Sequence, residues 1–232
     1  MQSSFSAGGF SFNFKPPKKH PTWNIFKDPT AYLLVASNLA VISSAVYYGI
    51  GIGAVLWGYW CQSIIIGFFS YFRIASLKQF TTEGVRVNGK QAEPTEATKK
   101  SISKMFAFIY GFFHIVYAFF LVVFSLFPES AALSLKTGEI WFVLATAATF
   151  FVNHSISFFY YSNKQQKQNI GPAVFQPFMR ILPMHITIIF GAMLVMSGIL
   201  QYLVVILFFS IKIAADVAMH ALEHAEQSGQ SG

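Results

Sequence analysis

Long apolar stretches, separated by shorter polar segments, run along most of the chain. Six of them approach the roughly 20 residues that a helix needs to cross the hydrocarbon core of a bilayer. We place the predicted membrane spans at about 30–48, 52–72, 104–127, 139–161, 178–196 and 200–224. The pattern therefore predicts an all-α fold, a multi-pass membrane protein with a bundle of six transmembrane helices over residues 30–224.

Glycine, proline and polar residues mark the ends of these spans. GIGIG at 49–53 separates the first two spans, and Pro128 ends the third. The longest predicted loop is TTEGVRVNGKQAEPTEATKK at 81–100. Residues 1–29 are predicted to be a basic cytoplasmic tail that lacks the apolar core of a secretory signal peptide, and residues 225–232 a flexible tail.

The composition supports a membrane location. Of the 232 residues, 54% are hydrophobic and only 11% charged, whereas about 25% charged is usual in soluble domains. The mean hydropathy is +0.52. A chain with this balance cannot hide its apolar surface in one water-soluble core, so we expect a protein of the cell membrane with lipid as its surroundings.

The basic residues orient the chain. Fourteen of the 16 Lys and Arg residues lie in three regions: four in the N-terminal tail, seven from Arg73 to Lys104 around the loop between spans two and three, and three from Lys164 to Arg180 around the loop between spans four and five. The opposite loops hold only Lys136, and Lys212 lies within a span. Positive charge favours the cytoplasmic side, so both termini are predicted to be cytoplasmic. Because these charges lie in loops rather than on one folded face, the net charge of +7 does not indicate a nucleic-acid partner.

A polar stripe interrupts the last apolar span. Lys212, Asp216, His220 and His224 recur every four residues, so they share one face of a helix. At about 1.5 Å of rise per residue, Asp216 lies roughly 12 Å from the cytoplasmic end of its span. Three further histidines lie about 10–15 Å deep on spans three, four and five, namely His114, His154 and His185. Asn38 and Gln62 fall at comparable depths.

Polar groups in lipid are costly unless they meet partners, so these side chains are predicted to face one another inside the bundle. Several imidazoles and a carboxylate are the ligands of a divalent metal, zinc above all. The hypothetical metal site comprises His114, His154, His185, Asp216 and His220. Asp216 is also the candidate catalytic residue, because a metal-bound water needs a general base or an orienting partner.

Other interpretations of the same residues stay open. A proton-coupled or metal-ion transporter would use ionisable side chains as a relay, and b-type haem would use His114 with His154 or His185 as axial ligands. A structural subunit would need only a hydrogen-bonded layer. Asp216 could instead pair with Lys212, and Arg180 could bind an anionic lipid headgroup near the site. Cys61, the single cysteine, is interpreted as a small buried side chain.

The pair His220 and His224, with a membrane Asp and a His on an earlier span, resembles the zinc membrane hydrolases that include alkaline ceramidases and progestin/adipoQ receptors. That resemblance implies a zinc held near the cytoplasmic face and hydrolysis of a lipid-like amide or ester. The chain departs from the family pattern in having six predicted spans rather than seven, and in placing Asp216 on the span of the His pair. The chain also resembles uncharacterised prokaryotic families of polytopic membrane proteins.

Overall fold

The computed structural model describes residues 3–7, 9–14, 29–126, 134–162, 168–181 and 210–211. Helices dominate these residues: α1 (Pro29–Tyr47), α2 (Ile52–Ala75), α3 (Glu96–Leu126) and α4 (Ile140–Ser162), with a short 3-10 helix, η3 (Thr137–Glu139), before α4. The helical character of the first four predicted spans is thus confirmed. α3 begins at Glu96 rather than near residue 104, because the helix extends beyond its apolar part.

Three helical stretches are long and apolar enough to cross a membrane: Ile52–Ala75, Glu96–Val123 and Thr137–Tyr160. A shorter apolar helix covers Tyr32–Tyr47. Of the last two predicted spans, the structure describes only residues 178–181 and 210–211, which are helical. The count of six spans and the location of the termini therefore stay predictions.

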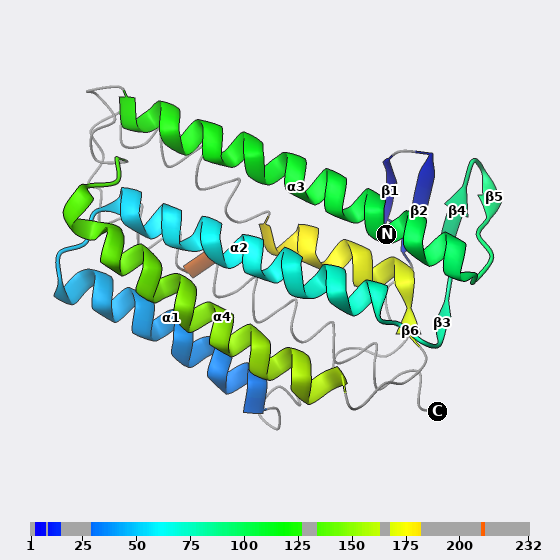
Figure 1. Ribbon diagram of the computed structural model, residues 1–232, viewed down its shortest axis with the longest axis horizontal. Helices are drawn as coiled ribbons and strands as arrows, with labels where there is room; N and C mark the ends of the chain where they lie inside the picture. The colour runs from blue at the N-terminus through cyan, green and yellow to red at the C-terminus, as the bar shows by residue number, and fades with distance from the viewer. Residues whose placement is uncertain are drawn as a thin grey trace.

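α2 is the central helix of the described bundle (Figure 1). It packs against α3 on one side and α4 on the other, and α1 packs against α4. α2 and α4 run in the same direction, whereas α1 and α3 run in the opposite one. Residues 3–7, 9–14, 76–95 and 168–169 consequently lie at one end of the bundle, which we call the sheet end.

Small residues allow the helices to approach α2 closely. A Cβ built on Gly67 would overlap the ring of Tyr110 on α3, and a Cβ on Gly58 would lie 3.0 Å from Thr146 on α4. Packing through small residues is how helices associate where water provides no driving force. The two glycines therefore set the spacing on both sides of α2.

The sheet end carries four antiparallel strands in the order β1-β2-β4-β5. They are β1 (Ser3–Ala7), β2 (Phe10–Phe14), β4 (Val85–Val87) and β5 (Lys90–Gln91). Asn88 and Gly89 join β4 to β5 with φ angles of 49° and 79°, as a two-residue Asn-Gly hairpin turn requires. Phe12 and Val85 are buried beneath the sheet. The expectation of an all-α fold therefore holds for the bundle but misses this sheet, which forms from segments predicted to be tail and loop.

A second pairing fixes the segment after α4. β3 (Phe80–Thr81) pairs in parallel with β6 (Gln168–Asn169), and helical residues 170–181 follow. The Asn169 carboxamide oxygen accepts a hydrogen bond from Gly171 N at 3.0 Å, which caps the start of this helix. Asn169 Nδ2 donates to Glu83 O at 3.0 Å. These contacts place residues 170–181 beside the last turns of α2.

At the opposite end, one buried carboxylate joins two turns. Gly51 N, just before α2, donates to Glu139 Oε1 at 2.8 Å. Lys136 N lies 3.4 Å from Glu139 Oε2. A negative charge beside the first turn of a helix interacts favourably with the helix dipole. Glu139 thereby links the turn between α1 and α2 to the start of α4.

Candidate functional site

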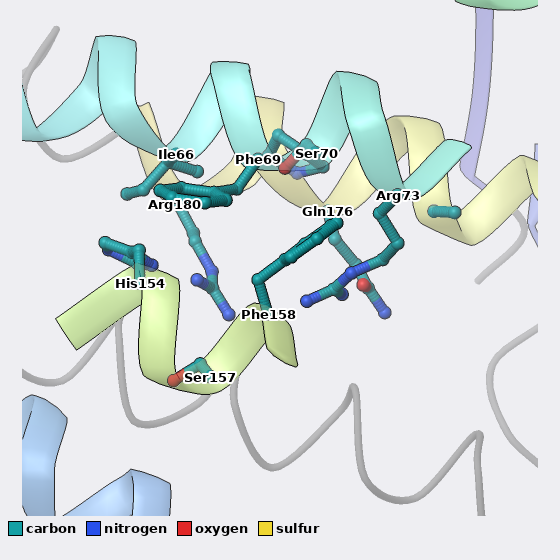
Figure 2. Close-up of a pocket in the computed structure, with 11 residues that line it drawn as sticks. Ile66, Phe69, Ser70, Arg73, His154, Ser157, Phe158, Gln176 and Arg180 are labelled. Atoms are coloured by element: carbon teal, nitrogen blue, oxygen red, sulfur yellow. The ribbon is translucent and has the colours of Figure 1, made fainter. Parts of the chain in front are cut away.

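A cleft lined by two arginines and a histidine lies between α2, α4 and residues 170–181, toward the sheet end (Figure 2). We call it the cationic pocket, and its lining residues are Ile66, Phe69, Ser70, Arg73, His154, Ser157, Phe158, Ala173, Gln176, Pro177 and Arg180. None of these residues is acidic. Its volume of about 30 Å³ is enough for one or two water-sized groups.

Each of the three elements contributes residues at helical spacing. On α2 the lining positions are 66, 69, 70 and 73, and on the following helical segment they are 173, 176, 177 and 180. α4 contributes 154, 157 and 158. Positions three, four and seven apart lie on one face of a helix, so each element presents a single stripe to the pocket. The stripes combine apolar side chains with hydroxyl, amide and basic groups.

Figure 2 shows the guanidinium groups of Arg73 and Arg180 reaching from different elements into the space between α2 and α4. Arg73 lies in the last turn of α2, where the helix dipole also favours a cation. The His154 ring lies beside Phe69, with centroids 6.5 Å apart and planes 27° from parallel. Phe69 and Phe158 approach to 5.5 Å between centroids. His154 thus stands against an aromatic wall of the pocket.

His114 lies on the other side of α2 and is 3% exposed. Its Nδ1 is 2.7 Å from the Tyr110 carbonyl oxygen, and its Nε2 is 2.8 Å from Ser63 Oγ. A carbonyl only accepts, so Nδ1 carries a proton; in the neutral ring Nε2 then accepts from the Ser63 hydroxyl. Tyr110 OH donates to Ser63 O at 2.8 Å. Both nitrogens of His114 are therefore hydrogen-bonded, and the contact of Nε2 with Ser63 joins α3 to α2.

The two predicted ligands that the structure describes are not brought together. His114 lines an apolar groove of about 410 Å³ between α2 and α3, which shares no residue with the cationic pocket lined by His154. Within the described part of the chain, no group of three or more His, Cys, Asp or Glu side chains could hold a metal ion. The other predicted ligands, His185, Asp216 and His220, lie outside the described residues, as do Lys212 and His224. The metal site as a whole stays a prediction.

Several polar side chains on α1, α2 and α4 are buried. Asn38 and Gln62, predicted to lie at matching depths, are 1% and 2% exposed. Asn153, which sequence reasoning did not single out, donates from Nδ2 to Ser37 Oγ at 3.2 Å. Within the part of the chain that the structure describes, Gln62 Nε2 has no hydrogen-bond partner, and Gln62 lies one helical turn from Ile66 of the cationic pocket.

The sequence signal for the cationic pocket was incomplete. Arg180, which the sequence suggests as a site for a lipid headgroup, and His154, a predicted metal ligand, both line the pocket. Arg73 was counted only among the charges that orient the chain. Arg73 follows Ser70 by three residues and Ile66 by seven, and this spacing predicts that all three lie on one face of the helix.

Together these features define a mainly helical protein with several helices of membrane-spanning length and a basic pocket near one end of the bundle. The chain belongs to a family of unknown function, DUF6498, whose model matches residues 24–232. No curated protein and no solved structure matches the chain.

Proposed function

We propose that this protein is an integral membrane protein that binds an anionic group in the cationic pocket. The observation that carries the proposal is the convergence of Arg73, Arg180 and His154 from three elements onto one cleft. Arginine presents planar, paired N–H donors that match the oxygens of phosphate or carboxylate. The hydroxyls of Ser70 and Ser157 and the amide of Gln176 add neutral hydrogen-bonding groups.

We further propose six spans, with the sheet end and both termini in the cytoplasm. The N-terminal strands, the segment after α2 and the segment after α4 share two sheets, which supports placing these three segments on one side. The N-terminal tail, the region from Arg73 to Lys104 and the region from Lys164 to Arg180 together hold 14 of the 16 basic residues, and positive charge favours the cytoplasmic face. In this orientation the cationic pocket lies in the cytoplasmic half of the membrane.

Ligand-dependent thermal stability of detergent-purified, full-length protein tests the anion site. The panel consists of inorganic phosphate, glycerol 3-phosphate, and phospholipids with neutral and anionic headgroups. An anion that binds only the folded state raises the melting temperature. We expect such a rise for wild type, and its loss in Arg73→Gln and Arg180→Gln.

Arg86→Gln provides the matched control. Arg86 is an exposed arginine on β4 at the same end of the molecule, outside the cationic pocket. This variant should keep the response, because it loses the same charge without touching the pocket. If no anion in the panel stabilises wild type more than Arg180→Gln, the proposal is wrong.

A zinc-dependent hydrolase of a lipid or other apolar substrate is a second candidate, because the predicted ligand His154 lines the same pocket as the two arginines. His185, Asp216 and His220 would complete the ligand set, and Asp216 would assist the attacking water. Elemental analysis and a visible spectrum of wild type and His154→Ala test this. About one zinc per chain, lost in the variant, would favour it; a haem spectrum would favour electron transfer; protein without either would leave transport as the alternative.

A further inference from the structure

We infer that Ser63 and His114 act as nucleophile and general base in the hydrolysis of a long-chain acyl ester held in the apolar groove between α2 and α3. The inference goes beyond the proposed function, because it uses neither the cationic pocket nor a metal. Three observations carry it: the hydrogen bond between a serine hydroxyl and an imidazole, the fixed tautomer of that imidazole, and the apolar groove that the imidazole lines.

The contact between Ser63 and His114 has the geometry of an activated nucleophile. His114 Nε2 lies 2.8 Å from Ser63 Oγ, and Nδ1 lies 2.7 Å from the Tyr110 carbonyl oxygen. Because that carbonyl holds the ring proton on Nδ1, Nε2 of the neutral ring accepts the proton of the Ser63 hydroxyl. A nucleophile, a base within hydrogen-bond reach and a third group that orients the base are the parts of a serine-histidine site. The backbone carbonyl here takes the place that a carboxylate has in a full triad.

The groove supplies a place for the substrate. Its volume of about 410 Å³ lies within the range of small-molecule sites. His114 lines the groove, and so do Trp60 and Ile64, which flank Ser63 on α2. From Trp60 to Tyr71 the groove follows α2 for roughly 16 Å, at about 1.5 Å per residue. An extended acyl chain fits a groove of that shape, with its carbonyl group at the end where Ser63 and His114 lie.

The reaction balances with water as the second reactant. Ser63 Oγ attacks the carbonyl carbon of the ester while its proton passes to His114 Nε2, and the alcohol leaves with that proton as the C–O bond breaks. Water then attacks the acyl-serine ester and gives a proton to His114 Nε2, and this proton returns to Ser63 Oγ as the fatty acid departs. Negative charge develops on the carbonyl oxygen in both steps. The Tyr110 hydroxyl, 3.3 Å from Ser63 Oγ, can donate to that oxygen after turning from the Ser63 carbonyl oxygen.

Covalent labelling of detergent-purified, full-length protein tests the pair. Hexadecyl fluorophosphonate forms a Ser–O–P bond, with loss of fluoride, at a serine that a base activates, and mass spectrometry of the digested protein locates the label. We expect label on Ser63 in wild type and none at this position in Ser63→Ala. Labelling of Ser63 should be at least about a hundredfold slower in His114→Gln, because a general base contributes about 10²–10⁴ in rate. Wild type should also hydrolyse p-nitrophenyl palmitate, and Ser63→Ala should not.

Ser155→Ala is the matched control for the serine. The Ser155 hydroxyl donates to the Phe151 carbonyl oxygen of its own helix, α4, at 2.7 Å rather than to an imidazole. This variant should be labelled at Ser63 as fast as wild type, and Ser155 itself should stay unlabelled.

Gly111→Leu tests whether the groove holds the acyl chain. Gly111 lines the groove, and a Cβ built on it would meet no atom within 4 Å, so a leucine side chain would occupy the groove itself. The hexadecyl probe should react severalfold more slowly with this variant, whereas the ethyl analogue should react at the wild-type rate.

The site of modification in wild type decides the inference even where a variant does not fold. If neither probe modifies Ser63 in wild type, or if Ser63 reacts as fast in folded His114→Gln as in wild type, the catalytic pair is overturned. If Ser63 reacts in a His114-dependent manner but Gly111→Leu affects both probes equally, the groove is overturned as the site of the acyl chain.

Discussion

Gly67→Ala tests the packing that joins α2 to α3. A Cβ at this position would overlap the Tyr110 ring, lying 2.6 Å from Cδ1 and 3.1 Å from Cζ. The ring cannot easily rotate away, because it stacks on His114 at 4.4 Å between centroids and contacts Phe106 at 5.1 Å and Phe178 at 5.4 Å. The helices must therefore separate, or the Tyr110 side chain must leave its site.

The cost has two parts. Overfilling a well-packed interface costs about 1–3 kcal/mol. Moving Tyr110 also breaks its 2.8 Å hydrogen bond to the Ser63 carbonyl oxygen, and interhelical hydrogen bonds in membrane proteins contribute about 0.6 kcal/mol on average and up to about 1.7. We therefore expect a loss of about 2–4 kcal/mol, which corresponds to a melting temperature about 5–10 °C lower.

Thermal melting in detergent measures the effect. Gly111→Ala is the matched control, since Gly111 lies on α3 in the same interface region and a Cβ there would meet no atom within 4 Å. That variant should melt within about 2 °C of wild type or above it, because alanine favours a helix by about 1 kcal/mol. Equal melting temperatures for Gly67→Ala and Gly111→Ala would refute the close approach of Tyr110 to α2.

Three further changes address other contacts. In ¹⁵N-histidine-labelled protein, the neutral His114 ring should carry its proton on Nδ1, because that atom lies 2.7 Å from a carbonyl oxygen; a spectrum with the proton on Nε2 would contradict the contact. Glu139→Ala should lower the free energy of unfolding by about 1 kcal/mol, seen as a lower melting temperature. Glu139→Gln should lose less, since its amide keeps an oxygen that accepts from Gly51 N; equal losses would argue against that bond. Gly84→Ala and Gly89→Ala share a positive φ, but only the first adds an atomic overlap. Gly89→Ala should therefore lower the free energy of unfolding by about 1 kcal/mol, and Gly84→Ala by clearly more, as measured by thermal melting. The reverse order would refute the close approach of Gly84 to Asn13 on β2.

The helices of the bundle were predictable because a run of apolar residues must hide its backbone polar groups when it crosses lipid. The sheet was not predicted, although part of its signal was present. Asn88 and Gly89 form the dipeptide most typical of a tight hairpin, and alternating residues precede it in VRV. The charged residues around this dipeptide are equally typical of a loop, so the local pattern does not distinguish a hairpin from a loop. The pairing of β2 with β4 joins residues far apart in the sequence, so no local pattern predicts it.

The metal hypothesis shows that a sequence indicates how deep a side chain lies in the membrane, but not which way it faces in the bundle. Counting residues along a span measures depth, and His114 and His154 were predicted at similar depths. Whether two side chains meet depends also on the direction each faces around the bundle and on which helix lies between them. Here α2 separates α3 from α4, so the two histidines line different cavities. The hydrogen bonds of His114 to Tyr110 and Ser63 then satisfy its ring without a metal.

Arg73 and Arg180 illustrate why residues that orient a membrane protein can also form its site. Both were counted among the charges that favour the cytoplasmic side, an effect that depends only on their number and location. The pairing of β3 with β6 and the cap at Asn169 bring residues 170–181 beside the end of α2, so two charges from separate segments line one cleft. Charges that favour the cytoplasmic side thus also line a cleft between helices, which the count and location of charges along the chain do not predict.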